Sequence, residues 1–123
     1  MSNLLDRFSP LTLVNILPVA NITVTTQGAA FDVRQATGMG QFLLMADAGG
    51  GASRTLDMII EDSADGSTGW ATFGVFPQQV QPAAALCLGL ILNLDAARGF
   101  VRANAVLANV TNWRIGLGLL ARY

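Results

Sequence analysis

The side chains able to do acid–base or metal chemistry are few in this chain, and the acidic ones gather in one stretch. The sequence has no histidine and no lysine, and its single cysteine is Cys87. The local acidic cluster consists of Asp57, Glu61, Asp62 and Asp65. Two carboxylates can hydrolyse a glycoside, but they must face a cleft with supporting aromatic residues, and nothing in the sequence indicates one.

The same residues do not form a recognisable metal or nucleophile pattern. Asp62 and Asp65 lie in a turn sequence that lacks the alternating oxygen ligands of a calcium loop. Cys87 lies in an apolar run, where we expect a small buried side chain rather than a reactive thiol. We therefore predict no catalytic residue, no metal site and no cofactor, and we expect that the protein is not an enzyme.

The acidic stretch belongs to the clearest structural signal in the chain, a predicted β-hairpin over residues 56–73. Leu56, Met58 and Ile60 alternate with more polar positions, which is the period of a strand with one buried face. Residues 62–67 then supply turn formers, and a second strand is expected from Trp70. In this interpretation the acids form a solvated hairpin tip that discourages pairing at a sheet edge.

Short β-type runs separated by turn residues continue to the end of the chain, and no segment has a sustained helical period. This pattern predicts an all-β protein, an antiparallel β-sandwich or jelly roll of about eight strands. We expect one sandwich domain over residues 13–123, preceded by an extended N-terminal arm over residues 1–12. The arm carries three large apolar side chains, Leu4, Leu5 and Phe8, which should dock on something.

Specific expectations follow for three of the predicted strands. Residues 21–26 alternate as a half-buried strand, and residues 86–95 place five leucines on one face, as in a central and largely covered strand. The last strand, residues 113–122, has alternate apolar residues on one face, namely Trp113, Ile115, Leu117 and Leu119. Gly116 and Gly118 leave its other face nearly bare. Another sheet or another subunit could pack closely against those glycines.

The composition points to a surface that other subunits cover. Charged residues make up 12% of the chain and hydrophobic residues 52%, whereas about a quarter of the residues in soluble domains are charged. The seven basic residues are all arginines scattered along a chain of net charge −1, so direct nucleic-acid binding is disfavoured. The uncharged run over residues 71–94 contains prolines and glutamines, and its apolar part is shorter than the ~20 residues of a membrane span.

Two stretches of the sequence resemble small structural proteins of tailed bacteriophages. The first is Ile60-Glu61-Asp62-Ser63-Ala64-Asp65-Gly66-Ser67-Thr68-Gly69-Trp70, and the second is Arg98-Gly99-Phe100-Val101-Arg102-Ala103, in which Phe100 replaces the more usual tyrosine. The two lie in the expected order within residues 41–123. The resemblance implies a β-sandwich or jelly-roll head component, chiefly a cement (decoration) protein that binds the major capsid protein on the outer capsid surface, often as a dimer or trimer.

The resemblance also implies a location in the virion after synthesis in the host cytoplasm. The N-terminus lacks the pattern of a secretory signal, and one cysteine allows no internal disulfide, which suits that compartment. A cement protein would stabilise the shell by bridging capsomers through many repeated modest contacts. The contacts are expected from the arm and the end of the chain, at Leu4, Leu5, Phe8, Trp113, Arg114, Arg122 and Tyr123.

Two other functions stay open at this point. The same sandwich could serve as a head–tail completion protein or a tail structural protein. A protein of another class, a carbohydrate-binding β-sandwich on the virion surface, would use exposed aromatic residues, among which Trp113 beside a turn is the best candidate.

Overall fold

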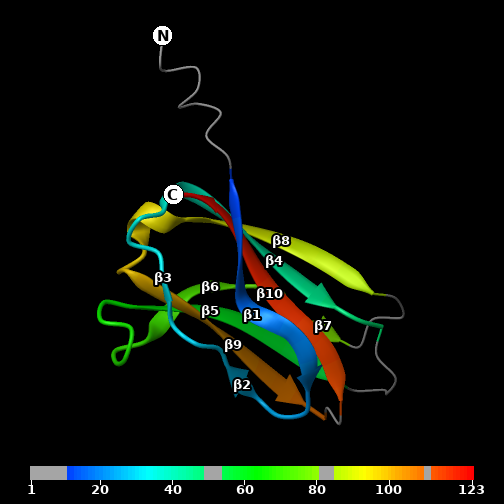
Figure 1. Cartoon of the computed structure of the whole chain (residues 1–123). Helices are drawn as coiled ribbons and strands as arrows, with labels where there is room; N and C mark the ends of the chain where they lie inside the picture. The colour runs from blue at the N-terminus through cyan, green and yellow to red at the C-terminus, as the bar shows by residue number, and fades with distance from the viewer. Residues whose placement is uncertain (1–10, 49–53, 81–84, 110–111) are drawn as a thin grey trace.

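The chain folds into two antiparallel β-sheets packed face to face, as predicted (Figure 1). The computed structural model describes residues 11–48, 54–80, 85–109 and 112–123. Within them lie ten strands and one 3-10 turn, η1: β1 Thr12–Ile22, β2 Thr26–Gln27, β3 Phe31–Asp32, β4 Thr37–Ala46, β5 Thr55–Ser63, β6 Ala71–Val75, β7 Gln79–Val80, β8 Leu86–Asn93, η1 Leu94–Ala96, β9 Phe100–Ala108 and β10 Trp113–Arg122. Leu4, Leu5 and Phe8 lie outside the described residues.

The strand order is that of a jelly roll. Sheet A has the order β1-β10-β4-β8, and sheet B has the order β2-β9-β5-β6, with β3 also paired to β9 and β7 to β5. When the short segments β2 and β3 count as one strand and β7 is set aside, eight strands in chain order form sheets 1-8-3-6 and 2-7-4-5. This arrangement of two four-stranded sheets is the jelly-roll order, which confirms the predicted fold class.

Alternating side chains from four strands fill the space between the sheets. β5 buries Leu56, Met58 and Ile60, and β10 buries Ile115 and Leu117, all of them fully. β4 and β9 alternate in the same way, so the inner faces of the two sheets supply most of one continuous core. The period-2 patterns in the sequence thus predicted the inner face of each of these strands correctly.

The first strand, β1, continues through a proline. β1 runs through Pro18 to Ile22, and its register with β10 shifts twice, between Asn15 and Leu17 and between Leu17 and Ala20. Proline is tolerated there because β1 is at the edge of sheet A, where one row of backbone donors has no ladder to join. The predicted half-buried strand over residues 21–26 is therefore wrong: Val24 lies in a loop and is 66% exposed.

The leucine-rich strand β8 lies at the other edge of sheet A, and the prediction that it is central is wrong. It pairs with β4 alone among the described strands. Its inward leucines are half-buried, and its outward residues, including Cys87, are exposed. Leu92 reaches across to sheet B, where it would lie 2.5 Å from a Cβ atom added to Gly74 of β6. The edge strands β8 and β6 are thus on the same side of the sandwich.

Asp65 is exposed at the hairpin turn after β5, as predicted, and its carboxylate closes the turn. The Asp65 carboxylate accepts hydrogen bonds from the backbone N–H groups of Ser67 and Thr68 at 2.9 and 2.8 Å, and from the Thr68 hydroxyl at 2.8 Å. The Ser63 hydroxyl also donates to it at 2.9 Å. These donors, the Thr68 backbone N–H first among them, hold the pKa of Asp65 well below its usual range.

We expect Asp65→Asn to lower the thermal midpoint at pH 7, because the neutral amide accepts these hydrogen bonds less strongly. A folded-state pKa below the unfolded value gives stability that is present above the unfolded pKa, about 3.9, and is lost as the pH falls. The gap in midpoint between wild type and variant should therefore narrow between pH 5 and pH 2. Circular dichroism melts measure it, with Ser67→Ala as the control that keeps the backbone donors. A gap that is constant with pH would contradict this role of the charge.

Candidate interaction surface

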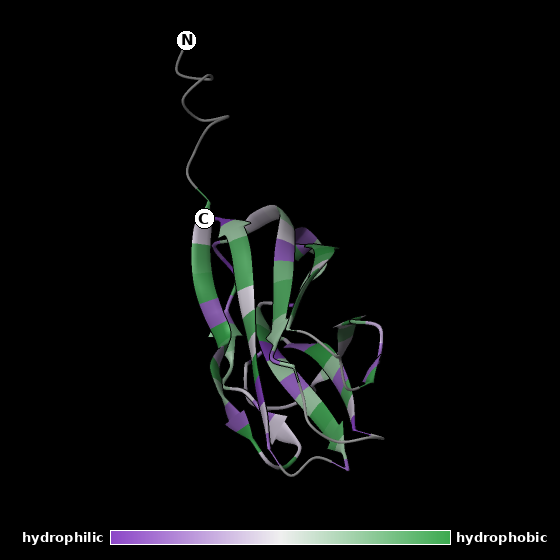
Figure 2. Ribbon diagram, turned by 90° about the vertical axis from the view of Figure 1, so that its right-hand side faces the viewer, coloured by the Kyte–Doolittle hydropathy of each residue, from purple (hydrophilic) through white to green (hydrophobic). Residues whose placement is uncertain are grey.

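The outer face of sheet A carries exposed or half-buried apolar side chains from all four of its strands. Side chains of β4 that do not point into the core point to this face, and the outward residues of the other three strands continue it. We define the outer face of sheet A by its apolar members, which are Leu13, Val19, Met39, Leu43, Met45, Cys87, Ile91 and Leu120. Figure 2 shows the result as long green stretches in the strands below the C-terminus, because both faces of these strands are apolar.

Charge is confined to the two ends of this face. β1, β4 and β8 contain no charged residue, and the outward charged residues of β10 are Arg114 and Arg122. Both arginines are exposed, and they stand at opposite ends of a strand that runs through the middle of the sheet. An apolar surface bordered by arginines has the composition of a protein–protein interface, where Arg is enriched and other charges are depleted.

Glycines make the face flat. A Cβ atom added to Gly116 would lie 2.5 Å from Val19 Cγ2, and one added to Gly89 would lie 2.6 Å from Gln41 Nε2. Side chains of neighbouring strands therefore pack directly against the backbone of these glycines. Gly116 and Gly118 thus leave room for Val19 and Leu13 of the adjacent strand β1.

Each arginine borders a hollow at its end of the face. At one end, a pocket of about 200 Å³ is lined by Val19, Met45, Ala46, Asp47, Ala85, Leu86 and Arg114. At the other end, a pocket of about 530 Å³ is lined by Leu11, Thr37, Gly38, Met39 and Arg122. These hollows can receive side chains of a partner, and the guanidinium groups can pair with carboxylates there.

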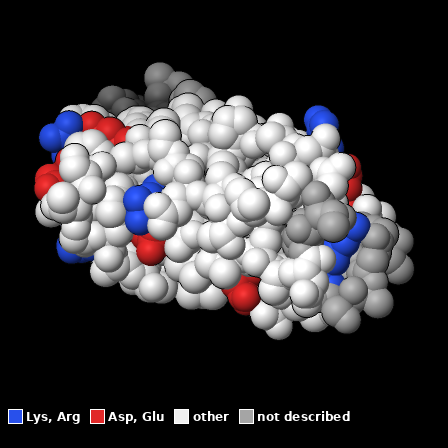
Figure 3. Space-filling view, turned by 90° about the horizontal axis from the view of Figure 1, so that it is seen from below, with Lys and Arg blue, Asp and Glu red and all other residues white. Residues whose placement is uncertain are grey.

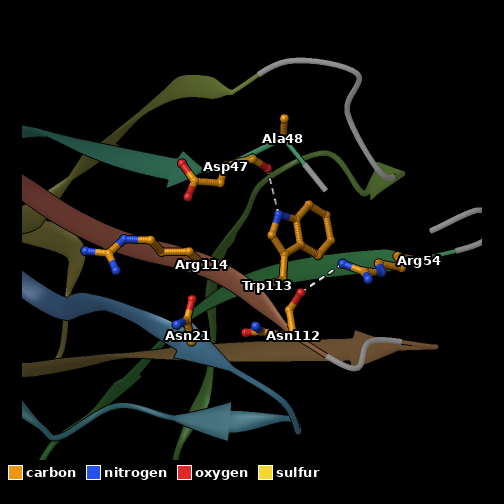
Figure 4. Close-up of a pocket in the computed structure, with 7 residues that line it drawn as sticks. All are labelled: Asn21, Asp47, Ala48, Arg54, Asn112, Trp113 and Arg114. Atoms are coloured by element: carbon orange, nitrogen blue, oxygen red, sulfur yellow. Dashed lines mark hydrogen bonds between the residues drawn. The ribbon is translucent and has the colours of Figure 1, made fainter. Parts of the chain in front are cut away.

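Trp113, predicted at an interface, is a core residue, so that prediction is wrong. Its side chain is 2% exposed, and its indole N–H donates to the backbone oxygen of Asp47 at 2.9 Å. Figure 4 shows it beside a small polar pocket of about 280 Å³, where Arg54 donates to the backbone oxygen of Asn112 at 2.8 Å. Trp113 is one of the alternate residues of β10 that face the core, so its side chain is buried although the residue stands next to a turn.

The other predicted contact residues at the end of the chain are accessible. Arg114 and Arg122 are exposed on the outer face of sheet A, and Tyr123 follows β10 with 46% of its surface exposed. Partial burial, aided by the Asp32 carboxylate, raises the pKa of the Tyr123 phenol. The structure thus brings the two arginines together with an apolar surface, which sequence reasoning had not identified.

The acidic cluster is dispersed into structural contacts. Asp62 is buried in β5, where its carboxylate accepts from the backbone N–H of Arg98 at 3.1 Å and pairs with the Arg98 guanidinium at 3.1 Å. Glu61 accepts from Arg102 at 2.8 Å, and the Arg102 guanidinium lies 4.3 Å from the centre of the Trp70 ring. Asp62 is therefore not part of a solvated tip.

These contacts join the two stretches that carry the family resemblance. Arg98 also donates to the backbone oxygen of Gly69 at 2.7 Å, so it ties the end of the turn to the end of β5. A Cβ atom added to Gly66 would lie 3.0 Å from the Phe100 ring, so the turn packs on the first residue of β9. The two sequence stretches form one structural unit, in which Arg98 and Phe100 hold the hairpin.

The signal for the outer face was present in the sequence but was interpreted differently. In β4, the inward residues Phe42 and Leu44 are apolar, and so are the outward residues Leu43 and Met45. In β8, the outward residue Ile91 is apolar like the inward leucines. In β8, apolar residues on both faces predict a covered central strand, whereas the sheet order places β8 at an edge. Cys87, expected to be buried, is exposed for the same reason, because β8 is at an edge and its outer side has no cover among the described residues.

The described surface offers little for metal or nucleic-acid chemistry. Within the described ranges, no three Cys, Asp or Glu side chains gather as metal ligands. The face seen from below in Figure 3 is predominantly uncharged, and its blue and red side chains form small separate groups rather than a basic stripe. None of the described elements is a helix long and apolar enough to cross a bilayer. Comparison with known protein families and with curated protein sequences finds no match.

Proposed function

We propose that this protein is a virion structural protein of a tailed bacteriophage, a cement (decoration) protein that binds the outside of the capsid. The observation that carries the proposal is the outer face of sheet A, an uncharged apolar surface with Arg114 and Arg122 at its ends. Its partner in this proposal is the major capsid protein. A face of this kind, left uncovered, is a liability for a soluble chain, and covering it is the simplest use for it.

Two further observations support the proposal. The jelly roll is a common architecture of viral capsid components, although lectins and other proteins share it, so the fold alone does not decide the function. The residues that carry the resemblance to phage structural proteins contact one another through Arg98 and Asp62. These residues therefore hold the hairpin to the start of β9, a structural role that fits a family of structural proteins.

The first test is the copy number of the protein in purified particles of the phage that encodes it. A cement protein should approach the major capsid protein in abundance on a stained gel, and it should be released by mild denaturant before the shell breaks. About a dozen copies per particle would instead favour the runner-up, a head–tail completion protein, and a copy number that follows the tail would favour a tail protein.

The second test is a binding experiment with variants of the outer face. We expect Leu13→Glu/Met39→Glu to reduce occupancy on capsids that lack the protein by at least about tenfold, because each carboxylate would have to be desolvated on binding. Leu13 and Met39 are 62% and 58% exposed, so the fold should tolerate both changes. The matched control, Val24→Glu/Gln27→Glu, adds the same charges at exposed positions away from this face. Equal loss in the control, or no loss in the variant, would contradict the proposal.

The contribution of the N-terminal arm is tested in the same assay by deleting residues 2–10. We propose that Leu4, Leu5 and Phe8 add contacts to those of the outer face, and undiminished occupancy of the deletion variant would exclude this.

The carbohydrate-binding alternative has lost its best residue, because the buried Trp113 cannot stack on a sugar. A glycan array that shows saturable binding by the wild type would restore that alternative.

A further inference from the structure

The edge strands on one side of the sandwich contain no charged residue. The edge strands on this side are β8 in sheet A and β6 and β7 in sheet B, which both pair with β5. All three come from residues 71–94, which contain no Asp, Glu, Lys or Arg. This uncharged stretch of the sequence is thus placed along one side of the molecule, and we define the β8 side by the strands β6, β7 and β8.

The opposite side has the features that protect natural sheet edges from pairing. There, β1 contains Pro18 and two register shifts, and the sheet B edge consists of the two-residue strands β2 and β3. β3 ends at Asp32, which pairs with Arg34 at 2.7 Å. Prolines, bulges, short strands and charges all discourage the addition of another strand.

β8 has none of these features. It is eight residues long, its register with β4 is continuous over Leu86–Asn93, and it contains neither proline nor charge. Its inward leucines Leu86, Leu88, Leu90 and Leu92 are only half-buried, and Ile91 on its outer side is 60% exposed. A long, regular and apolar edge strand of this kind is a template for pairing with another chain.

The edge of sheet B, formed by β6 and β7, lies beside β8 and continues the same surface. Val75 at the end of β6 is 50% exposed, and Val80 at the end of β7 is 61% exposed. Polar residues on this edge, such as Thr72 and Gln79, are uncharged. A partner that extends sheet A at β8 would therefore also meet apolar side chains from the edge of sheet B.

We propose that this partner is a second copy of the chain, which pairs its own β8 antiparallel to β8 about a two-fold axis. An antiparallel strand pair is self-complementary under such an axis, so the same surface serves both copies. The absence of charge removes the repulsion that would oppose self-pairing, and it leaves nothing with which a charged partner could be selected. The dimer would bury the half-exposed leucines of both copies.

The geometry of the pairing limits its register. A two-fold axis perpendicular to the sheet keeps outer side chains on the outer face, so each outward residue lies opposite another outward residue. With Gly89 opposite its own copy, Cys87 of one copy faces Ile91 of the other. The two sheets A would then form one eight-stranded sheet whose outer apolar faces are continuous.

The test is the mass of the full chain in solution by sedimentation velocity, under reducing conditions and over a range of concentrations. We expect the wild type at twice its chain mass of 12.9 kDa and Cys87→Lys/Ile91→Lys at the mass of a single chain. The lysines would place like charges opposite each other across the axis. The control Leu13→Lys/Val24→Lys adds two lysines at exposed positions of the opposite side and should stay dimeric. A Cys87→Ser variant, also expected to be dimeric, shows that loss of the thiol has no effect.

A monomeric or trimeric wild type, a dimeric Cys87→Lys/Ile91→Lys variant, or a dissociated control would each overturn the proposal. Hydrogen exchange gives a second test that needs no variant. The amides of residues 86–93 that do not bond to β4 should become more protected as the wild-type concentration rises, and those of β1 should not. This inference does not depend on capsid binding. A dimer that does not bind capsids contradicts only the proposed function, and a monomer that binds them contradicts only the dimer.

Discussion

Replacing Trp113 with alanine is expected to lower the free energy of unfolding by about 3–5 kcal/mol, the usual range for removing a large buried aromatic side chain. Trp113 is 2% exposed and belongs to the hydrophobic core, so its removal leaves a cavity between the sheets. The change also removes the donor to the backbone oxygen of Asp47. Urea denaturation followed by circular dichroism measures the effect.

Two further variants separate the parts of this effect. Trp113→Phe keeps an aromatic ring in the core and loses the indole N–H, so about 1–2 kcal/mol is expected. Tyr123→Ala changes an aromatic residue near the same end of the chain that is 46% exposed, and it should change stability by no more than about 0.5 kcal/mol. If Trp113→Ala were as mild as Tyr123→Ala, Trp113 would have to be a surface residue, as the sequence had suggested.

Replacing Asp62 with alanine is expected to destabilise the fold by about 2 kcal/mol. Removing one partner of a fully buried ion pair costs about 3–5 kcal/mol, and the lower figure applies because the Arg98 side chain is 42% exposed and keeps contact with water. The Asp62 side chain itself is 8% exposed and accepts from both the backbone and the side chain of Arg98. Without the Asp62 carboxylate, Arg98 in the connection between β8 and β9 loses these contacts with β5.

A double-mutant cycle of Asp62→Ala and Arg98→Ala measures the coupling between the two residues. We expect a coupling energy of about 1–2 kcal/mol, within the range for residues that share a hydrogen-bond network. The exposed pair of Asp32 and Arg34 is the matched control, and its coupling should be smaller because solvent screens it. Equal coupling in the two cycles would show that the burial of Asp62 adds nothing.

The fold class was predictable because the alternation in β5 and β10 reports directly which side chains face the core. The same local signal cannot report which strands are neighbours. Five leucines in a row of alternate positions made β8 look central, although the sheet order places it at an edge. For the same reason β1 could not be recognised as continuous: proline ends a central strand but is accepted at an edge.

The interaction surface was only partly predictable. Arg114 and Arg122 were identified because they alternate with the inward residues of the last strand, and the structure places both on the outer face of sheet A. Trp113 was misplaced because a residue beside a turn can belong to either face. The apolar residues Leu43 and Ile91 could be assigned to a surface only when the strand order showed that nothing described in the chain covers that side of sheet A.

The position of β10 also determines when the protein can fold during its synthesis. β10 is the last of the described strands to be synthesised, yet it lies between β1 and β4 and pairs with both. Pairing Thr12 with Ala121 closes a loop of nearly the whole chain, and such non-local contacts form slowly. Sheet A therefore assembles only after β10 has been synthesised. A nascent or truncated chain that ends before Trp113 leaves the facing edges of β1 and β4 open, and such edges promote aggregation.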